Sequence, residues 1–183
     1  MKFFRAALAK ALRPFFLHSA IVFVSVWLAT HLPAHAPAGF VNPYLTQPGP
    51  LAASFLKWDA HWYTFIAAQG YDAKNVVFFP ALILLIRSIA TLGIDYAIAG
   101  LLACNVFAFL SFAAMSAAFR HDFPPPLAER ALYVYAVMPT SIFLNSIYTE
   151  PLFLTFALVC LLSARQGKWW QAGACGALAA LTR

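Results

Sequence analysis

Long apolar runs separated by short polar stretches make up most of this chain. A helix needs roughly 20 apolar residues to cross the hydrocarbon core of a bilayer. The apolar runs cover residues 15–32, 96–119, 127–147, 151–164 and 169–183, of which the fourth is short and the last reaches the end of the sequence. The pattern predicts an all-α fold, a polytopic membrane helix bundle that forms a single domain over residues 1–183.

The stretch between the first two runs, residues 33–95, contains the least apolar part of the chain. Its last section, residues 76–94, is long enough to cross a membrane but carries Arg87 near its middle. This section can be interpreted as another span, or as an interfacial helix from which Arg87 reaches back to water.

The distribution of Lys and Arg decides between these topologies, because short loops rich in positive charge stay in the cytoplasm. If residues 76–94 are a span, the basic residues divide almost evenly between the two sides. If they lie at the interface, the outer side holds only Lys57, Lys74 and Arg87, and the cytoplasmic side holds Lys2, Arg5, Lys10, Arg13, Arg120, Arg130, Arg165 and Lys168. The charges therefore favour a cytoplasmic N-terminus and an outer loop with interfacial helices over residues 33–95.

The N-terminus has an alternative interpretation as a secretory signal peptide. Basic residues, an apolar stretch and the sequence "PAHA" suit cleavage after Ala36. The apolar run is longer than a typical signal core, and further spans follow it. Both features favour an uncleaved first helix.

Composition and charge narrow the class of protein. Hydrophobic residues make up 63% of the chain and charged residues 10%, against about 45–50% and about 25% in ordinary soluble domains. The net charge of +6 is scattered over loops and helix ends, which argues against a nucleic-acid partner. The Cys and His spacings fit no metal site, and no glycine-rich nucleotide loop is present. We therefore expect no metal and no cofactor.

Asp59 is the first candidate catalytic residue. Around it, aromatic and apolar residues recur at helical spacing, namely Phe55, Trp58, Trp62, Phe65 and Ile66. One interpretation is an interfacial aromatic belt with a solvated carboxylate. The other is a carboxylate flanked by bulky rings, whose proton affinity is raised so that it can act as a base.

Glu150 is the second candidate, and the topology places it on the same outer face as Asp59. It precedes Pro151 at the start of an apolar run, where a carboxylate can cap the amides of the next helix or take part in chemistry. Asn145 and Tyr148 nearby can supply hydrogen bonds to a polar ligand.

The remaining candidates for substrate binding are Trp58, His61, Arg87 and Arg183. His61 lies two residues after Asp59, so the two side chains point apart on a helix and do not suit a metal. Arg183 lies roughly 20 Å along the last apolar run. An arginine inside a membrane usually has a partner, so Arg183 is interpreted either as an anion site or as the end of an unfinished helix.

Four segments together resemble the PIG-V-like mannosyltransferases: "KWDAHWYTFIAAQGY", "VVFFPALILLIRSI", "VMPTSIFLNSIYTEPLF" and the terminal "ALTR". The resemblance implies a class C glycosyltransferase fold with interfacial helices in the first outer loop. It also implies a polyprenyl-phosphate sugar donor, usually mannose. The family's proposed catalytic acid in the first outer loop corresponds to Asp59, and the acid of its second outer motif corresponds to Glu150.

The expected function is inverting transfer of a sugar to a glycan or glycolipid acceptor on the outer face, with Asp59 as base and Lys57, Arg87 or Arg183 stabilising the departing phosphate. Membrane lipid is a further expected partner. Family members continue beyond the position of Arg183, so we expect either an N-terminal fragment or the product of a truncated gene, which lacks a C-terminal half or a partner subunit. The lack of a eukaryotic retention signal favours a bacterial inner membrane, with the site facing the periplasm.

The alternative is a non-catalytic membrane protein, either a transporter fragment or a lipid-binding subunit. Transporters more often place ionisable residues near the middle of the membrane. A non-catalytic protein also predicts that Asp59 and Glu150 tolerate replacement by their amides.

Overall fold

The computed structural model describes residues 2–32 and 53–183, and this part of the chain contains helices and no strands. Ala36, the alternative cleavage point, lies outside the described residues. The elements are α1 (Lys2–Thr30), α3 (Ala60–Gln69), α4 (Pro80–Ala90), α5 (Tyr96–Asp122), α6 (Pro125–Val137), the 3-10 helix η1 (Pro139–Leu144), α7 (Glu150–Arg165) and α8 (Trp169–Ala180). The all-α prediction is confirmed.

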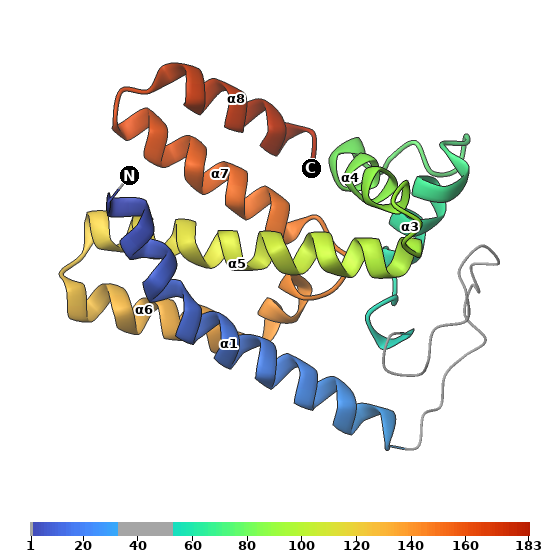
Figure 1. The fold of residues 1–183 in the computed structure, drawn as a ribbon, viewed down its shortest axis with the longest axis horizontal. Helices are drawn as coiled ribbons and strands as arrows, with labels where there is room; N and C mark the ends of the chain where they lie inside the picture. The colour runs from blue at the N-terminus through green and yellow to red at the C-terminus, as the bar shows by residue number, and fades with distance from the viewer. Residues whose placement is uncertain (1, 33–52) are drawn as a thin grey trace.

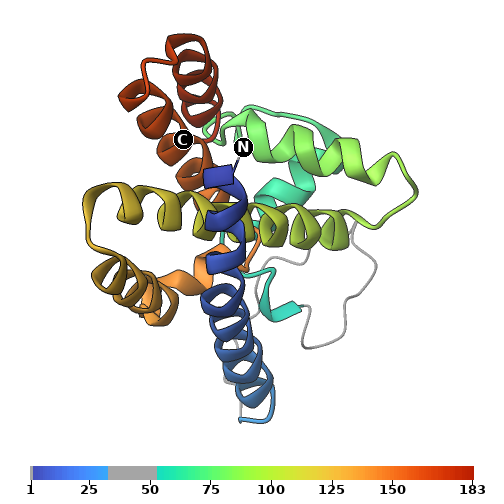
Figure 2. The ribbon, with the colours of Figure 1, turned by 60° about the vertical axis from the view of Figure 1, so that its left-hand side comes forward.

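Helix α5 forms the centre of the bundle and contacts α1, α3, α4, α6, α7 and η1. Figure 1 shows α7 and α8 on one side of α5 and α1 and α6 on the other, with α3 and α4 gathered at one end. The view in Figure 2 shows that α1 crosses α5 steeply. The N-terminal end of α1, the α5–α6 connection and the α7–α8 turn all lie at the end of α5 that is opposite to α3 and α4.

Among the described residues, two helices are long and apolar enough to cross a membrane. They are Ala6–Thr30 in α1 and Tyr96–Asp122, with mean hydropathies of 1.6 and 2.1. Asp95 caps the second of these, because its carboxylate accepts hydrogen bonds from the amides of Ala97 at 2.8 Å and Ile98 at 3.4 Å.

The section 76–94 forms only the short helix α4, of 11 residues. At 1.5 Å per residue such a helix is roughly 16 Å long, which is about half the thickness of the hydrocarbon core. Its length agrees with the interfacial interpretation, and its position relative to the membrane stays a prediction.

The expected helix over residues 127–147 is not continuous, and this prediction is corrected. Helix α6 ends at Val137, Met138 adopts an extended conformation with φ −61° and ψ 132°, and η1 begins at Pro139. The cause is Pro139, since proline disfavours the helical conformation in the residue before it. The chain therefore leaves the helical path before Tyr148 and Glu150. Helix α1 also begins earlier than residue 15 and includes Pro14.

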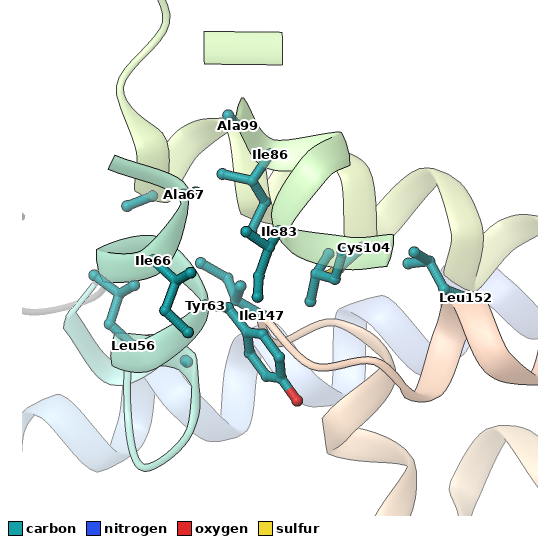
Figure 3. Close-up of a cluster of buried hydrophobic side chains, with 13 residues drawn as sticks. Leu56, Tyr63, Ile66, Ala67, Ile83, Ile86, Ala99, Cys104, Ile147 and Leu152 are labelled. Atoms are coloured by element: carbon teal, nitrogen blue, oxygen red, sulfur yellow. The ribbon is translucent and has the colours of Figure 1, made fainter. Parts of the chain in front are cut away.

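The irregular segment 145–149 is held by buried contacts with α1 and α5. Asn145 Nδ2 donates hydrogen bonds to Asn105 Oδ1 at 2.6 Å and to Ser19 Oγ at 3.2 Å. Ile147 is fully buried in a core cluster that also contains Tyr63, Ile83 and residues of α5, as Figure 3 shows. These contacts fix the backbone immediately before Glu150.

Gly100 permits the close approach of Ile147 to α5. A Cβ atom at Gly100 would lie 2.9 Å from Ile147 Cδ1. We therefore expect Gly100→Ala to lower the free energy of unfolding by about 1–3 kcal/mol through overpacking. Gly173→Ala in α8 is the matched control, since nothing lies within 4 Å of its added Cβ. Thermal unfolding in detergent measures both, and equal unfolding temperatures for the two variants would contradict this account of Gly100.

Candidate functional site

Asp59, Glu150 and Arg183 come from parts of the chain that are far apart in sequence. Asp59 immediately precedes α3, Glu150 is the first residue of α7, and Arg183 follows α8. The segment after α8 is anchored to α4, because Ala81 N donates a hydrogen bond to Leu181 O at 3.0 Å. Figure 1 accordingly shows the C-terminal end beside α4.

Glu150 and Arg183 form an ion pair. Arg183 Nη2 lies 3.6 Å from Glu150 Oε1, and the Arg183 side chain is 60% exposed whereas that of Glu150 is 27% exposed. The Arg183 guanidinium carbon also lies 6.0 Å from the centre of the Phe153 ring, at the limit of a cation–π contact. Arg183 therefore has a carboxylate partner, and its side chain still remains largely exposed.

Glu150 does not cap its helix through side-chain hydrogen bonds. Its Oε2 atom is buried and makes no hydrogen bond. The carboxylate nevertheless lies in the first turn of α7, where the helix dipole favours a negative charge. Its strongest described interaction is with Arg183, so its main structural effect is to hold that cation at the start of α7.

Asp59 occupies the N-cap position of α3 but makes no capping hydrogen bond with its side chain. The side chain is exposed rather than enclosed by the aromatic residues around it. The sequence-based picture of a carboxylate flanked by rings is corrected in this respect, because the rings of Trp62 and Tyr63 pack against Phe78 instead. The carboxylate is therefore open to a ligand that approaches from solvent.

Trp58 precedes Asp59 in a strained conformation. Its φ of 50° is the only positive value at a non-glycine residue in the part of the chain that the structure describes. Such a conformation is costly for a bulky side chain and persists only where surrounding contacts impose it. The Trp58 side chain is 74% exposed, and its ring lies 6.4 Å from that of Phe143. Backbone strain next to an exposed carboxylate is a common feature of functional sites.

Two tyrosines connect Asp59 with Glu150. The Tyr148 hydroxyl donates a hydrogen bond to Lys57 O at 3.2 Å, and the Asp59 amide hydrogen-bonds to the same hydroxyl. The Tyr63 hydroxyl hydrogen-bonds with Thr149. Figure 3 shows the Tyr63 ring inside the cluster with its oxygen directed out of it.

Both tyrosines are poor acids in this setting. Burial is the main cause that raises the pKa of Tyr63 and that of Tyr148 to about 12, and the nearby charges of Asp59 and Glu150 add to the effect. The hydroxyl groups therefore stay protonated at neutral pH, with Tyr148 donating to Lys57 O and the Tyr63 oxygen accepting from Thr149. Sequence reasoning missed Tyr63 and Thr149, although a helix beginning at Asp59 places Tyr63 one turn later and Thr149 directly precedes Glu150.

Tyr148→Phe tests the hydrogen bond from the Tyr148 hydroxyl to Lys57 O, which joins the segment carrying Asp59 to the segment carrying Glu150. We expect a loss of about 0.5–1.5 kcal/mol in the free energy of unfolding, together with a loss of function at the candidate site, because the loop carrying Asp59 is held less firmly. Tyr71→Phe is the matched control, since the Tyr71 hydroxyl donates to a backbone carbonyl, Phe78 O, at 2.9 Å within the same outer segment. Equal function in the Tyr148→Phe and Tyr71→Phe variants would contradict this role.

The other expected site residues are arranged differently. His61 is half-buried in α3, and burial, followed by the charge of Lys57, lowers its pKa, so it is neutral at pH 7. Arg87 is exposed in the last turn of α4 and forms no ion pair among the described residues. Asn145 is hydrogen-bonded to Ser19 of α1 and Asn105 of α5. It lines a cavity of about 480 Å³ between these helices, so it does not face Glu150.

Within residues 2–32 and 53–183, no group of three His, Cys, Asp or Glu side chains is placed so that it could hold a metal ion. The chemistry that this site offers is instead that of an exposed carboxylate, an ion pair with a largely exposed arginine, and two neutral hydroxyl groups.

Comparison with known proteins identifies the family to which these motifs belong. A family model described as mannosyltransferase (PIG-V) matches residues 11–183. The mouse (Mus musculus) protein GPI alpha-1,6-mannosyltransferase 2 is 28% identical over 173 residues, in an alignment that covers 83% of this chain and 35% of the relative. The chain thus spans about a third of that relative's length. No solved structure matches it.

Proposed function

Because the chain belongs to the PIG-V mannosyltransferase family, we propose that it carries the reaction centre of a membrane enzyme that transfers mannose. The donor is a mannosyl polyprenyl phosphate, and the acceptor is a hydroxyl group of a glycan or glycolipid at the outer face of the membrane. The chain supplies the first outer loop and the second outer motif of this reaction centre.

One observation supports this proposal most strongly, namely the convergence of Asp59, Glu150 and Arg183. The Tyr148 hydroxyl, two residues before Glu150, donates to Lys57 O, two residues before Asp59, and Arg183 lies 3.6 Å from Glu150. A base and a cation at one site are what glycosyl transfer from a phosphate donor requires, because a proton must be accepted and a phosphate must leave.

In the proposed reaction, the Asp59 carboxylate accepts the proton of the acceptor hydroxyl while that oxygen forms a bond with the anomeric carbon of mannose. The bond between the anomeric carbon and the phosphate oxygen breaks, and its electron pair leaves with the polyprenyl phosphate. Arg183, held by Glu150, donates hydrogen bonds to the oxygen on which negative charge develops. Attack opposite to the leaving group inverts the anomeric configuration.

The proposed orientation follows from the charge distribution together with the fold. The site lies at the end of α5 where α3 and α4 gather, whereas Arg120, Arg165 and Lys168 lie at the opposite end. Since basic residues mark the cytoplasmic side, the site faces the outside of the cell. A bacterial inner membrane, with the site in the periplasm, is part of the same proposal.

The donor assignment can be tested with membranes that contain the complete polypeptide encoded by the gene. We expect labelled mannose to move from a mannosyl polyprenyl phosphate into a product, and no movement of label from GDP-mannose when synthesis of the lipid-linked sugar is blocked. A glucosyl polyprenyl phosphate serves as the control for the sugar specificity of the donor site. Transfer directly from GDP-mannose would refute the proposed donor, and absence of any transfer would favour a non-catalytic protein.

A further inference from the structure

At the end of the bundle opposite to the candidate site, α1, α5 and α6 enclose two adjoining hollows of about 250 and 180 Å³. Lys10 of α1 and Glu129 of α6 line both hollows. The first is completed by Ala9, Arg13 and Tyr133, and the second by Ser116, Arg120, Pro125, Ala128 and Leu132. Figure 1 shows this region where α1 begins and α5 turns into α6.

Positive charge is in excess around these hollows. Lys10, Arg13 and Arg120 line them, against the single carboxylate of Glu129, and no ion pair joins these residues to a carboxylate among those the structure describes. Another cation at the same end of the bundle does form an ion pair. Arg165 Nη1 lies 2.7 Å from Asp122 Oδ1. The charges around the hollows therefore lack the compensation that Arg165 has.

Helix dipoles do not account for all three cations. Arg120 lies in the last turn of α5, where a positive charge is favourable. Lys10 and Arg13 lie two to three turns inside α1, beyond the reach of a helix terminus, and the N-terminal end would in any case disfavour them. Their position beside α6 leaves them available to a negatively charged group from outside the chain.

The two helices α1 and α6 also carry exposed apolar residues. Leu12 on α1 is 43% exposed, and Leu127 and Val134 on α6 are 50% and 61% exposed. A ligand that fits both the cations and these apolar residues has an anionic head and hydrocarbon chains. Free phosphate would satisfy only the cations.

We propose that Lys10, Arg13 and Arg120 bind the phosphate of an anionic phospholipid of the cytoplasmic leaflet, whose acyl chains lie along α1 and α6. Basic pockets between membrane helices on this side are suited to such head groups. Arginine can hold phosphate oxygens with two hydrogen bonds at once, and lysine adds a point charge. The bound lipid offsets the positive charge of α1 and α5 that the single Glu129 carboxylate of α6 leaves in excess.

Native mass spectrometry of the complete polypeptide, titrated with phosphatidylglycerol or phosphatidylcholine, tests this site. We expect phosphatidylglycerol to bind more tightly, and the double variant Lys10→Gln, Arg120→Gln to lose this preference by roughly fivefold for each charge removed. Arg165→Gln is the matched control, because that cation is paired with Asp122 and does not line the hollows. It is expected to keep the preference of the unmodified protein.

The charge-preserving double variant Lys10→Arg, Arg120→Lys separates lipid binding from folding, and it is expected to bind phosphatidylglycerol as the unmodified protein does. An unchanged preference in the Gln double variant would overturn the proposal. So would equal affinity for the two lipids, or displacement of phosphatidylglycerol by inorganic phosphate at similar concentrations. None of these outcomes depends on mannosyl transfer, so this proposal and the proposed function fail separately.

Discussion

Asp59→Asn is expected to lower the rate of mannosyl transfer by about 10²–10⁴-fold, the usual contribution of a general base. The amide has the same size as the carboxylate but cannot accept the acceptor's proton. The Asp59 side chain is exposed and makes no capping hydrogen bond, so the substitution leaves the fold intact. Transfer of labelled mannose, normalised to the amount of inserted protein, measures the effect.

Asp72→Asn is the matched control for Asp59→Asn. Asp72 is another exposed carboxylate of the outer segment, and its Oδ1 accepts a hydrogen bond from the nearby Lys74 amide at 2.7 Å. Its amide variant should transfer mannose at close to the unmodified rate. If the two variants were equally active, Asp59 would not be the base, and the interpretation of the segment as an interfacial aromatic belt would be preferred.

Arg183→Gln is expected to slow transfer by about 10²–10³-fold, the typical loss when one group that stabilises developing negative charge is removed. The ion pair with Glu150 is partly exposed and contributes at most about 1 kcal/mol to folding, so unfolding would not explain such a loss. Arg87→Gln is the comparison, since Arg87 is also an exposed cation of this region but belongs to α4. Its transfer rate should change little.

A double-mutant cycle tests whether Glu150 acts through Arg183. Glu150→Gln should slow transfer less than Arg183→Gln, and the double variant should be no slower than Arg183→Gln alone, because residues that act as a unit are not additive. A larger loss in Arg87→Gln than in Arg183→Gln would assign phosphate stabilisation to α4 instead. Fully additive losses would show that Glu150 has a separate role.

The apolar pattern predicted the elements of this fold better than their ends. Helix α7 covers the expected run 151–164 almost unchanged, since Pro151 defines its start and Gly167 follows its last turn. The break at Pro139 was missed because apolar character continues across it, although the restriction that proline places on Met138 is visible in the sequence. The break matters because it allows residues 145–149 to be irregular.

The candidate site was predictable in part. The quoted motifs contain Asp59 and Glu150, and the structure brings both near Tyr63 and Tyr148. The pairing of Glu150 with Arg183 depends on how α8 folds back along α7 and contacts α4, which no periodicity encodes. The strain at Trp58 is equally a result of tertiary contacts, since nothing about tryptophan favours a positive φ.

The configuration of the transferred sugar tests the central claim most directly. A mannosyl polyprenyl phosphate of known anomeric configuration would be incubated with the complete polypeptide, and the product analysed by NMR. Direct displacement with Asp59 as base predicts a mannoside whose anomeric configuration is opposite to that of the donor. A mannoside with the donor's configuration would contradict the account, because retention requires a second displacement for which this mechanism has no place.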